Sequence, residues 1–174
     1  MANIAGTIIA LCISSKGGVP KYPQEKIEVG QYGFIGDFHA GSTRISRKTG
    51  KSKINDRQIT LVAQEALDIV NIELGISLKP GDLGENITTI GLGNLSGING
   101  GVLLLAEGVE GMVLFRVVEQ NDPCSNLSIY HKQLPKKTMG KRGVLAIVSQ
   151  GAGVHLRPGA KICIVEKKLD VAFQ

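Results

Sequence analysis

One cysteine stands where a reactive thiol would be useful. The apolar run Met112–Val118 has the length and β-branched content of a strand, and it ends in the polar segment Glu119–Asn126, which contains Cys124. A cysteine in a loop directly after a strand is exposed and held on a rigid support. Its thiolate is both a nucleophile for sulfur chemistry and a soft metal ligand. Cys124 is therefore the candidate catalytic or metal-binding residue.

The other two cysteines lie in apolar surroundings. Cys12 falls in the run Ile4–Ser14 and Cys163 in Lys161–Glu166, and both runs have the length of a buried strand. Unpaired cysteines are commonly small core residues, so we expect both thiols to be buried and structural. Three widely spaced cysteines predict neither a disulfide framework nor a zinc cluster, and at least one free thiol suits a reducing compartment.

Two short motifs carry polar residues that could face a ligand. The glycine-rich stretch Gly33–Gly41 contains Asp37 and His39, which an extended backbone would point to one side. They form either a ligand-binding or metal-binding pair, or a carboxylate that orients a loop histidine, and two ligands are too few for a metal site. Glu85 and Asn86 lie where a turn enters a strand, and Asn86 either hydrogen-bonds a heterocyclic ligand or satisfies the turn.

Basic residues are concentrated between residues 44 and 57, where six Lys or Arg accompany one acid. Such a segment is too polar for a core element and predicts a long, mobile loop. It is either a solvated surface loop or a lid over a phosphate or other anion, with Arg44, Lys53 and Arg57 as candidate phosphate partners.

A second basic turn follows Pro135, and it contains Lys141 and Arg142. These two cations could place positive charge beside Cys124 if the fold brings them close, whereas Asp122 would act in the opposite direction.

The remaining sequence predicts a mainly β scaffold. The 174 residues suffice for one domain, and 23 glycines, 4% aromatics and many short β-branched runs favour turn-rich β structure over a helical bundle. A helix is predicted over residues 61–74, ended by Gly75. The pattern from Val102 to Val118 predicts a hairpin that leads to Cys124, and Val144–Val148 predicts a closing strand.

No apolar run approaches the roughly 18 residues of a membrane span. The run Ile8–Ile13 lacks the flanks of a secretion signal, so a cytoplasmic location without membrane association is expected.

Several segments, taken in order, resemble the MOSC domain family, named for the C-terminal domain of molybdenum cofactor sulfurases. Each motif is weak alone, but their order and spacing are specific and cover about residues 4–166. The chain resembles a small standalone member, with a single MOSC domain over residues 1–174 and a basic insertion at about 42–57. The matching segments are Gly33–Gly41, Asp56–Leu61, Pro80–Thr89, Pro123–Cys124, Gly143–Val148 and Arg157–Gly159.

The resemblance implies a closed β-barrel related to that of pyruvate kinase, with a few peripheral helices. It further implies that Cys124 either carries sulfur or binds the molybdenum cofactor (molybdopterin). Sulfur would come from a pyridoxal-phosphate-dependent cysteine desulfurase and pass, as a persulfide, to a molybdoenzyme or its cofactor. From the residues and the resemblance together, the candidate walls of a cofactor pocket around Cys124 are Asp37, His39, Arg44, Lys53, Arg57, Glu85, Asn86, Asn121, Lys141 and Arg142.

Three functions therefore compete. The preferred one is a molybdenum-cofactor-associated sulfur carrier or sulfurtransferase that uses a persulfide on Cys124. The alternative is a molybdenum-cofactor oxidoreductase that reduces N-hydroxylated compounds, with Cys124 as the metal ligand. The third is a non-enzymatic basic barrel that binds nucleic acid through residues 44–57, and it is disfavoured because the chain has no tryptophan and few aromatic residues to stack on bases.

Overall fold

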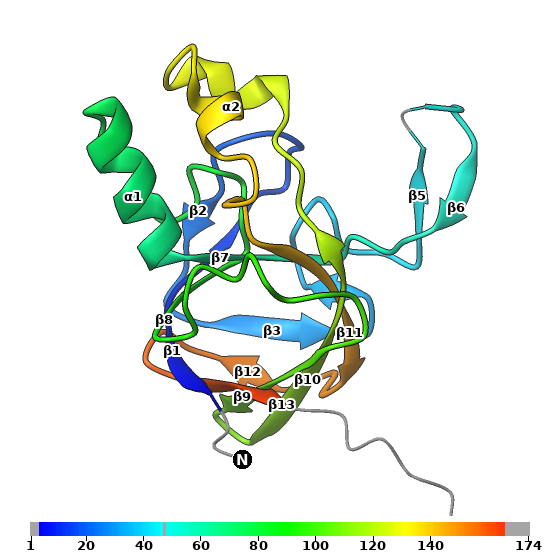
Figure 1. The fold of residues 1–174 in the computed structure, drawn as a ribbon. Helices are drawn as coiled ribbons and strands as arrows, with labels where there is room; N and C mark the ends of the chain where they lie inside the picture. The colour runs from blue at the N-terminus through cyan, green and yellow to red at the C-terminus, as the bar shows by residue number, and fades with distance from the viewer. Residues whose placement is uncertain (1–3, 47, 166–174) are drawn as a thin grey trace, which may run out of the picture.

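The structure, a computed structural model, describes residues 4–46 and 48–165 (Figure 1). Arg47 of the basic segment and Glu166 of the last expected strand lie outside these ranges. The elements in chain order are β1 (Ala5–Ile13), β2 (Tyr22–Pro23), β3 (Ile27–Gly30), β4 (Gly33–Phe34), β5 (Thr43–Ile45), β6 (Ser52–Ile54), β7 (Ile59–Ala63), α1 (Gln64–Leu74), β8 (Ile87–Ile90), β9 (Leu103–Gly108), β10 (Gly111–Gln120), the 3-10 helix η1 (Ser125–Ile129), α2 (Leu134–Lys137), β11 (Val144–Gln150), β12 (His155–Leu156) and β13 (Lys161–Val165).

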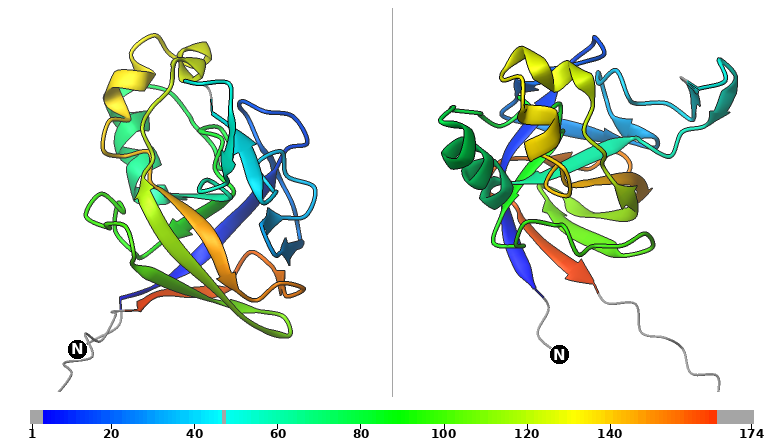
Figure 2. Two further views of the ribbon diagram at one scale, coloured as in Figure 1. Left: turned by 90° about the vertical axis from the view of Figure 1, so that its right-hand side faces the viewer. Right: turned by 45° about the horizontal axis from the view of Figure 1, so that its top comes forward.

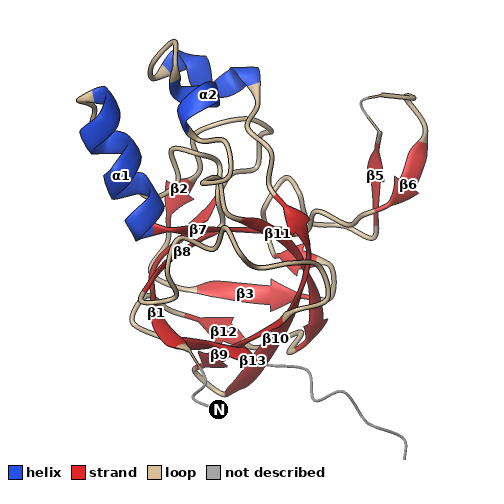
Figure 3. Ribbon diagram, viewed as in Figure 1, coloured by secondary structure: helices blue, strands red, loops and turns tan. Residues whose placement is uncertain are grey.

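Within the described residues, seven strands close into a barrel in the order β1, β13, β9, β10, β11, β7, β8 and back to β1. The pairs Ala5↔Cys163 and Thr7↔Ile90 flank β1 and complete the closure. All neighbours are antiparallel except β7 and β8, which run parallel. The helices gather at one end of this barrel, as the colouring in Figure 3 shows. A closed, mainly β barrel with a few peripheral helices was expected, and the structure confirms it.

Two apolar clusters hold the molecule together. The larger fills the barrel, where Phe34 packs edge-on against Phe115 with ring centroids 6.4 Å apart. The smaller, called here the helical-end cluster, lies between α1, η1 and α2 and consists of Val62, Leu67, Val70, Leu78, Leu83, Leu127 and Leu134.

Strand β7 joins the two clusters because it is buried on both faces. Ile59, Leu61 and Ala63 point into the barrel, while Val62 points to the helical end. This double burial corrects the helix predicted over residues 61–74: Leu61–Ala63 belong to β7, and α1 begins only at Gln64. An apolar run buried on two sides has no two-residue alternation that would distinguish it from a buried helix. The predicted end of the helix at Gly75 is confirmed, because Gly75 adopts the left-handed conformation (φ 62°).

The basic segment, for which a long, mobile loop was predicted, contains a hairpin. Strands β5 and β6 pair through Thr43↔Ile54, Arg44↔Lys53 and Ile45↔Ser52. The hairpin stands away from the barrel wall in Figure 1 and in the right-hand view of Figure 2. Like charges at a cross-strand pair are unfavourable, but Asp56 lies between Arg44 and Lys53 and offsets their repulsion. Residues 42–57 are called the basic arm below.

Two further expectations concern strands and the membrane. The hairpin that leads to Cys124 is confirmed as β9 and β10, whose ten-residue second strand runs on to Gln120. Among the described residues, no helix has the length and apolar content to cross a membrane.

Candidate functional site

Cys124 sits just beyond β10, in the segment that rises toward α2 (Figure 1). The end of the strand is fixed by the Asn121 N–H, which donates to the Gly143 carbonyl at 2.9 Å. Cys124 itself is extended (φ −127°, ψ 161°), and its carbonyl accepts a hydrogen bond from the N–H of Leu127 at 3.2 Å. The thiol is therefore carried by a short segment anchored at both sides.

The side chain of Cys124 is half-buried and packs against the helical-end cluster. Cys12, by contrast, is fully buried in β1, and burial, with Glu85 nearby, raises the pKa of its thiol to about 12. Cys163 corrects the prediction that both strand cysteines are buried, because it is half-buried near the end of β13. Cys163 nevertheless lies within a paired barrel strand, whereas Cys124 lies in a loop.

Arg142 connects the cysteine segment to the Glu85–Asn86 motif. Its guanidinium donates to the carbonyl of Asp122 at 2.6 Å and to the carbonyl of Leu83 at 3.1 Å. The Nε atom is buried and has no hydrogen-bond partner among the described residues. Planar donors on one rigid group fix two loops relative to each other more firmly than a lysine would. Arg142 thus positions the segment that carries Cys124.

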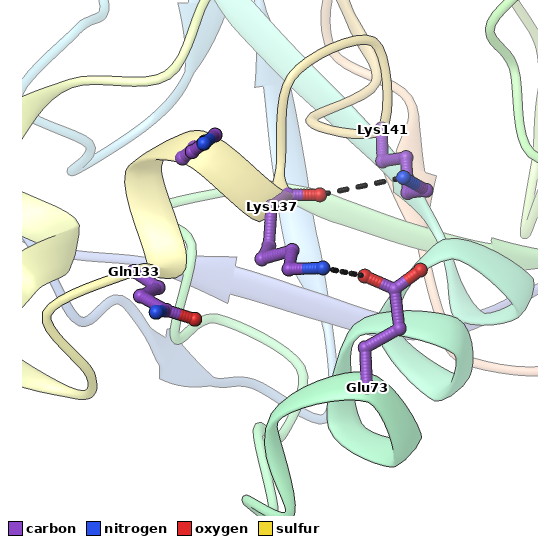
Figure 4. A pocket seen from close by; sticks show the side chains of 5 residues that line it. Glu73, Gln133, Lys137 and Lys141 are labelled. Atoms are coloured by element: carbon purple, nitrogen blue, oxygen red, sulfur yellow. Dashed lines mark hydrogen bonds and ion pairs between the residues drawn. The ribbon is translucent and has the colours of Figure 1, made fainter.

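Lys141 points to a different part of the surface. Its Nζ lies 3.4 Å from the carbonyl of Lys137, whose own ammonium pairs with Glu73 at 3.3 Å (Figure 4). Together with Gln133 and Lys136 these residues line an open hollow of about 450 Å³ between α1 and α2. The hollow is basic, but Cys124 is not among its lining residues.

Glu85 and Asn86 are completely buried and bind main chain. The Glu85 carboxylate accepts hydrogen bonds from the N–H groups of Gly81 and Leu83 and from the Thr88 hydroxyl, and burial raises its pKa. These bonds shape the turn before β8.

Asn86 joins two strands of the barrel. Its Oδ1 accepts from the Thr60 N–H at 3.1 Å, and its Nδ2 donates to the Cys12 carbonyl at 3.1 Å. Each end of the amide thus makes one hydrogen bond to main chain, and the side chain is completely buried, which favours the structural role over contact with a ligand.

Asp37 and His39 form a polar cluster with Lys21, a residue that the sequence analysis missed. The Asp37 carboxylate pairs with Lys21 Nζ at 2.8 Å, and neither side chain is exposed to solvent. It also accepts hydrogen bonds from the N–H groups of Ser14 and His39 at 3.1 and 3.0 Å. The Nδ1 atom of His39 lies 3.6 Å from the same carboxylate. The carboxylate therefore organises the loop, which is the second of the two roles considered for this pair.

The charges of this cluster perturb each other strongly. Burial alone would raise the pKa of Asp37, but His39, Lys21 and the Ser14 N–H more than offset it and hold the pKa well below the usual range. Burial lowers the pKa of Lys21, and the Asp37 carboxylate opposes this effect. Nothing in the polar sequence around Lys21 signals this burial, because only the folded loop brings it against Asp37.

The three candidate phosphate-binding cations of the basic arm are paired with carboxylates. Arg44 and Lys53 contact Asp56 at 2.7 and 3.2 Å, and Arg57 contacts Glu119 at 3.1 Å. Arg44 and Lys53 therefore lie on the projecting hairpin, while Arg57 lies at its root against β10.

The structure brings most of the predicted residues to the helical end of the barrel through a continuous series of contacts. Lys21 links Asp37 to the turn before Glu85, since its N–H donates to the Gly81 carbonyl at 2.9 Å. Arg142 then links that turn to the cysteine segment. Cys124 lies at this end and packs on one side against the helical-end cluster.

Comparison with known proteins agrees with this geometry. A family model described as the MOSC domain matches residues 36–168, which include Asp37, His39, Asn86, Cys124 and Arg142. The chain belongs to the MOSC domain family. A search of curated proteins returned no significant match.

Solved structures share the fold of this MOSC domain protein. The YuaD protein from Bacillus subtilis superposes with a TM-score of 0.81 at 20% identity, over 94% of this chain and 97% of that one. YiiM from Geobacillus stearothermophilus gives a TM-score of 0.67 at 23% identity, over 95% of this chain and 77% of that one. YiiM from Escherichia coli gives 0.63 at 18% identity, over 96% and 71%. At these identities the likeness establishes the fold.

Proposed function

We propose that this MOSC domain protein is a sulfur carrier that holds sulfur as a persulfide on Cys124. The observation that carries the proposal is the setting of Cys124, a half-buried thiol in a loop that Arg142 fixes at the helical end of the barrel. Cys12 is excluded as the carrier because burial raises the pKa of its thiol to about 12 and thereby suppresses the nucleophilic thiolate.

The reaction is an exchange between a thiolate and a persulfide. The Cys124 thiolate attacks the outer sulfur of a donor persulfide, R–S–SH. A new S–S bond forms on Cys124, the S–S bond of the donor breaks, and the donor leaves as its thiolate while the proton stays on the transferred sulfur. The same exchange in reverse passes the sulfur to a thiolate of the acceptor, and this step consumes no oxidant or reductant. Delivery of the sulfur to the molybdenum of a cofactor as sulfide would need two further electrons, which a thiol reductant would supply.

The half-buried position suits a carrier. The helical-end cluster covers one side of the Cys124 side chain and limits attack by water and by small thiols from that side. The open side remains accessible to a donor. The proposed donor is a pyridoxal-phosphate-dependent cysteine desulfurase, and the proposed acceptor is a molybdoenzyme or its cofactor.

The residues present fit sulfur transfer better than they fit the intact molybdenum cofactor. Cys124 is a suitable soft ligand for the metal. The cations predicted to hold a phosphate, Arg44, Lys53 and Arg57, are already engaged by carboxylates, and Arg142 is engaged by two carbonyls. The Asn86 amide is occupied by β1 and β7. A persulfide needs only the thiol and an approach for its partners.

Treatment with cyanide tests the proposal, because cyanide removes the outer sulfur of a persulfide as thiocyanate. Protein purified without oxygen, or loaded with glutathione persulfide, is expected to release close to one thiocyanate per chain. The Cys124→Ser variant is expected to release almost none. The matched control is Cys163→Ser, which removes another half-buried thiol and should release as much as the wild type.

Metal analysis of the same samples completes the test. Release of sulfur that persists in Cys124→Ser would refute the assignment of this residue. Stoichiometric molybdenum that disappears in Cys124→Ser, with no cyanide-labile sulfur, would replace the carrier by the molybdenum-dependent reductase.

A further inference from the structure

The basic arm carries the whole net charge of the chain. Residues 42–57 hold six of the 20 basic residues and one of the 15 acidic residues, so the remaining sequence is neutral, with 14 of each. The formal net charge of +5 thus falls on residues 42–57, whose hairpin stands away from the barrel in the right-hand view of Figure 2. A charge placed in this way acts on a partner that approaches the arm and hardly on the rest of the surface.

The two faces of the arm differ in character. Side chains alternate along each strand, so the pairing register places Thr43, Ile45, Ser52 and Ile54 on one face. Ile45 is 64% exposed and Ile54 is 80% exposed. The opposite face bears Arg44 and Lys53, paired with Asp56, and the exposed Lys48 and Lys51 lie toward the tip. Charge and exposed apolar surface therefore occur together on the arm.

The strands of the arm are also incompletely paired. Within the described residues, β5 and β6 pair only with each other. A two-stranded hairpin of three-residue strands is marginally stable alone. A partner that covers the isoleucines would stabilise it.

The root of the arm is built into the candidate site. Asn55 is buried, and its Nδ2 donates to the carbonyls of His39 and Gly41 at 2.7 and 2.8 Å. On the other side, Arg57 contacts Glu119 of β10, the strand that leads to Cys124. A molecule held by the arm is therefore held near the strand that leads to Cys124.

We infer that the basic arm is the docking element for the protein that delivers sulfur to Cys124, and that this donor offers an acidic surface with a small apolar groove. The inference rests on the proposed function. Exchange of sulfur between two cysteines requires that the two proteins bring their sulfur atoms into contact, so a docking surface must adjoin the thiol. Nucleic acid fits the arm less well, because residues 42–57 contain no aromatic side chain on which a base could stack.

The test compares two sulfur donors on the 174-residue chain. One donor is a pyridoxal-phosphate-dependent cysteine desulfurase supplied with cysteine, and the other is glutathione persulfide, which needs no docking. Lys48→Glu/Lys51→Glu is expected to lower the kcat/KM for loading from the desulfurase about tenfold or more at low salt, with loading from glutathione persulfide unchanged. This loss should shrink in about 1 M salt, where charges are screened.

A second variant tests the apolar face. Ile45→Ser/Ile54→Ser removes no charge, so its loss of loading from the desulfurase should persist at high salt. The control Lys26→Glu/Lys161→Glu changes the net charge equally at exposed positions on β13 and beside β3, and it should load like the wild type.

Each outcome decides between the claims. Three results would overturn the docking role alone. The first is an equal loss of loading in both charge-reversed variants, and the second is normal loading of the arm variants. The third is a wild type that glutathione persulfide loads and the desulfurase does not. Arm-dependent binding to single-stranded RNA or to vesicles containing phosphatidylserine, without arm-dependent loading, would assign the arm to another partner and overturn it as well. Failure of glutathione persulfide to load wild-type Cys124 would refute the carrier function itself and the docking role with it.

Discussion

The buried pair of Lys21 and Asp37 should control both the stability of the site and its response to pH. Neither side chain is exposed, and the two groups lie 2.8 Å apart. In Lys21→Met the volume is nearly kept, but the carboxylate loses its ammonium partner and retains the N–H groups of Ser14 and His39 and the His39 side chain 3.6 Å away. Loss of one partner of a buried pair typically costs about 3–5 kcal/mol, because the other charge remains buried.

The largest possible loss of stability in Lys21→Met decreases as the pH falls, because the unpaired Asp37 carboxylate can become neutral by binding a proton. For a group with an unfolded-state pKa of about 3.9, protonation costs about 4 kcal/mol at pH 7 and about 1.5 kcal/mol at pH 5. The variant should therefore lose about 3–4 kcal/mol at pH 7 and no more than about 1.5 kcal/mol at pH 5.

The wild type should show the opposite dependence on pH. The pKa of Asp37 is held well below its unfolded value, so its stabilising contribution is fully present above about pH 4. This contribution is lost as the pH falls through the depressed folded-state pKa. In the variant the folded-state pKa is raised instead, so the penalty is absent at low pH and grows as the pH rises.

Urea unfolding followed by circular dichroism at pH 7 and pH 5 measures the difference, since the chain has no tryptophan for fluorescence. Lys26→Met, at an exposed lysine, is the control and should change stability by less than about 0.5 kcal/mol. In Lys21→Met/Asp37→Asn the buried charge is gone, so this double variant should be more stable than Lys21→Met at pH 7. A cost in Lys21→Met below about 1 kcal/mol, or one equal at the two pH values, would refute the reasoning.

Three further substitutions probe the scaffold of the site. Arg142→Met should lower the free energy of unfolding by about 1–2 kcal/mol, because two carbonyls lose a shared donor. It should also speed the alkylation of Cys124 by iodoacetamide, measured by mass spectrometry. Unchanged alkylation would show that other contacts hold the loop. Gly143→Ala should cost about 3 kcal/mol or more in urea unfolding, because a Cβ at φ +74° would overlap a carbonyl of β7, whereas Gly159→Ala, at φ +93° in open space, should cost only about 1 kcal/mol. Asn86→Leu should lower the free energy of unfolding by about 2–4 kcal/mol, because a buried N–H and a buried carbonyl lose their hydrogen-bond partner. Normal stability with loss of sulfur loading would instead make Asn86 a ligand-binding residue.

The sequence predicts the barrel well because its strands carry local signals. The hairpin of β9 and β10 and the end of α1 at Gly75 follow from turn residues and from apolar period. Where the prediction fails, tertiary contacts decide. Leu61–Ala63 form a strand because β8 and β11 flank them, and residues 43–54 form a hairpin although their composition is that of a loop.

The site is predictable in its nucleophile and less so in its surroundings. Cys124 stands out because a proline and polar residues interrupt an apolar pattern. Lys21 carries no such signal, since a lysine in a polar stretch is ordinarily exposed and only the loop carrying Asp37 buries it. Arg142 was expected to act on the thiol through its charge, but its hydrogen bonds to two carbonyls give it a positioning role that only the folded loops reveal.

The barrel and the loops around Cys124 differ in how much buried structure supports them. The closed barrel buries a large apolar cluster, whereas the loops around Cys124 rest on the seven-residue helical-end cluster, one buried ion pair and the guanidinium of Arg142. Regions with few buried contacts open at a lower free energy than the global unfolding of the core. A carrier must expose its thiol to a donor and later to an acceptor without unfolding. For the proposed carrier we therefore expect the segment around Cys124 to open while the barrel stays closed, near the strand that the root of the basic arm contacts.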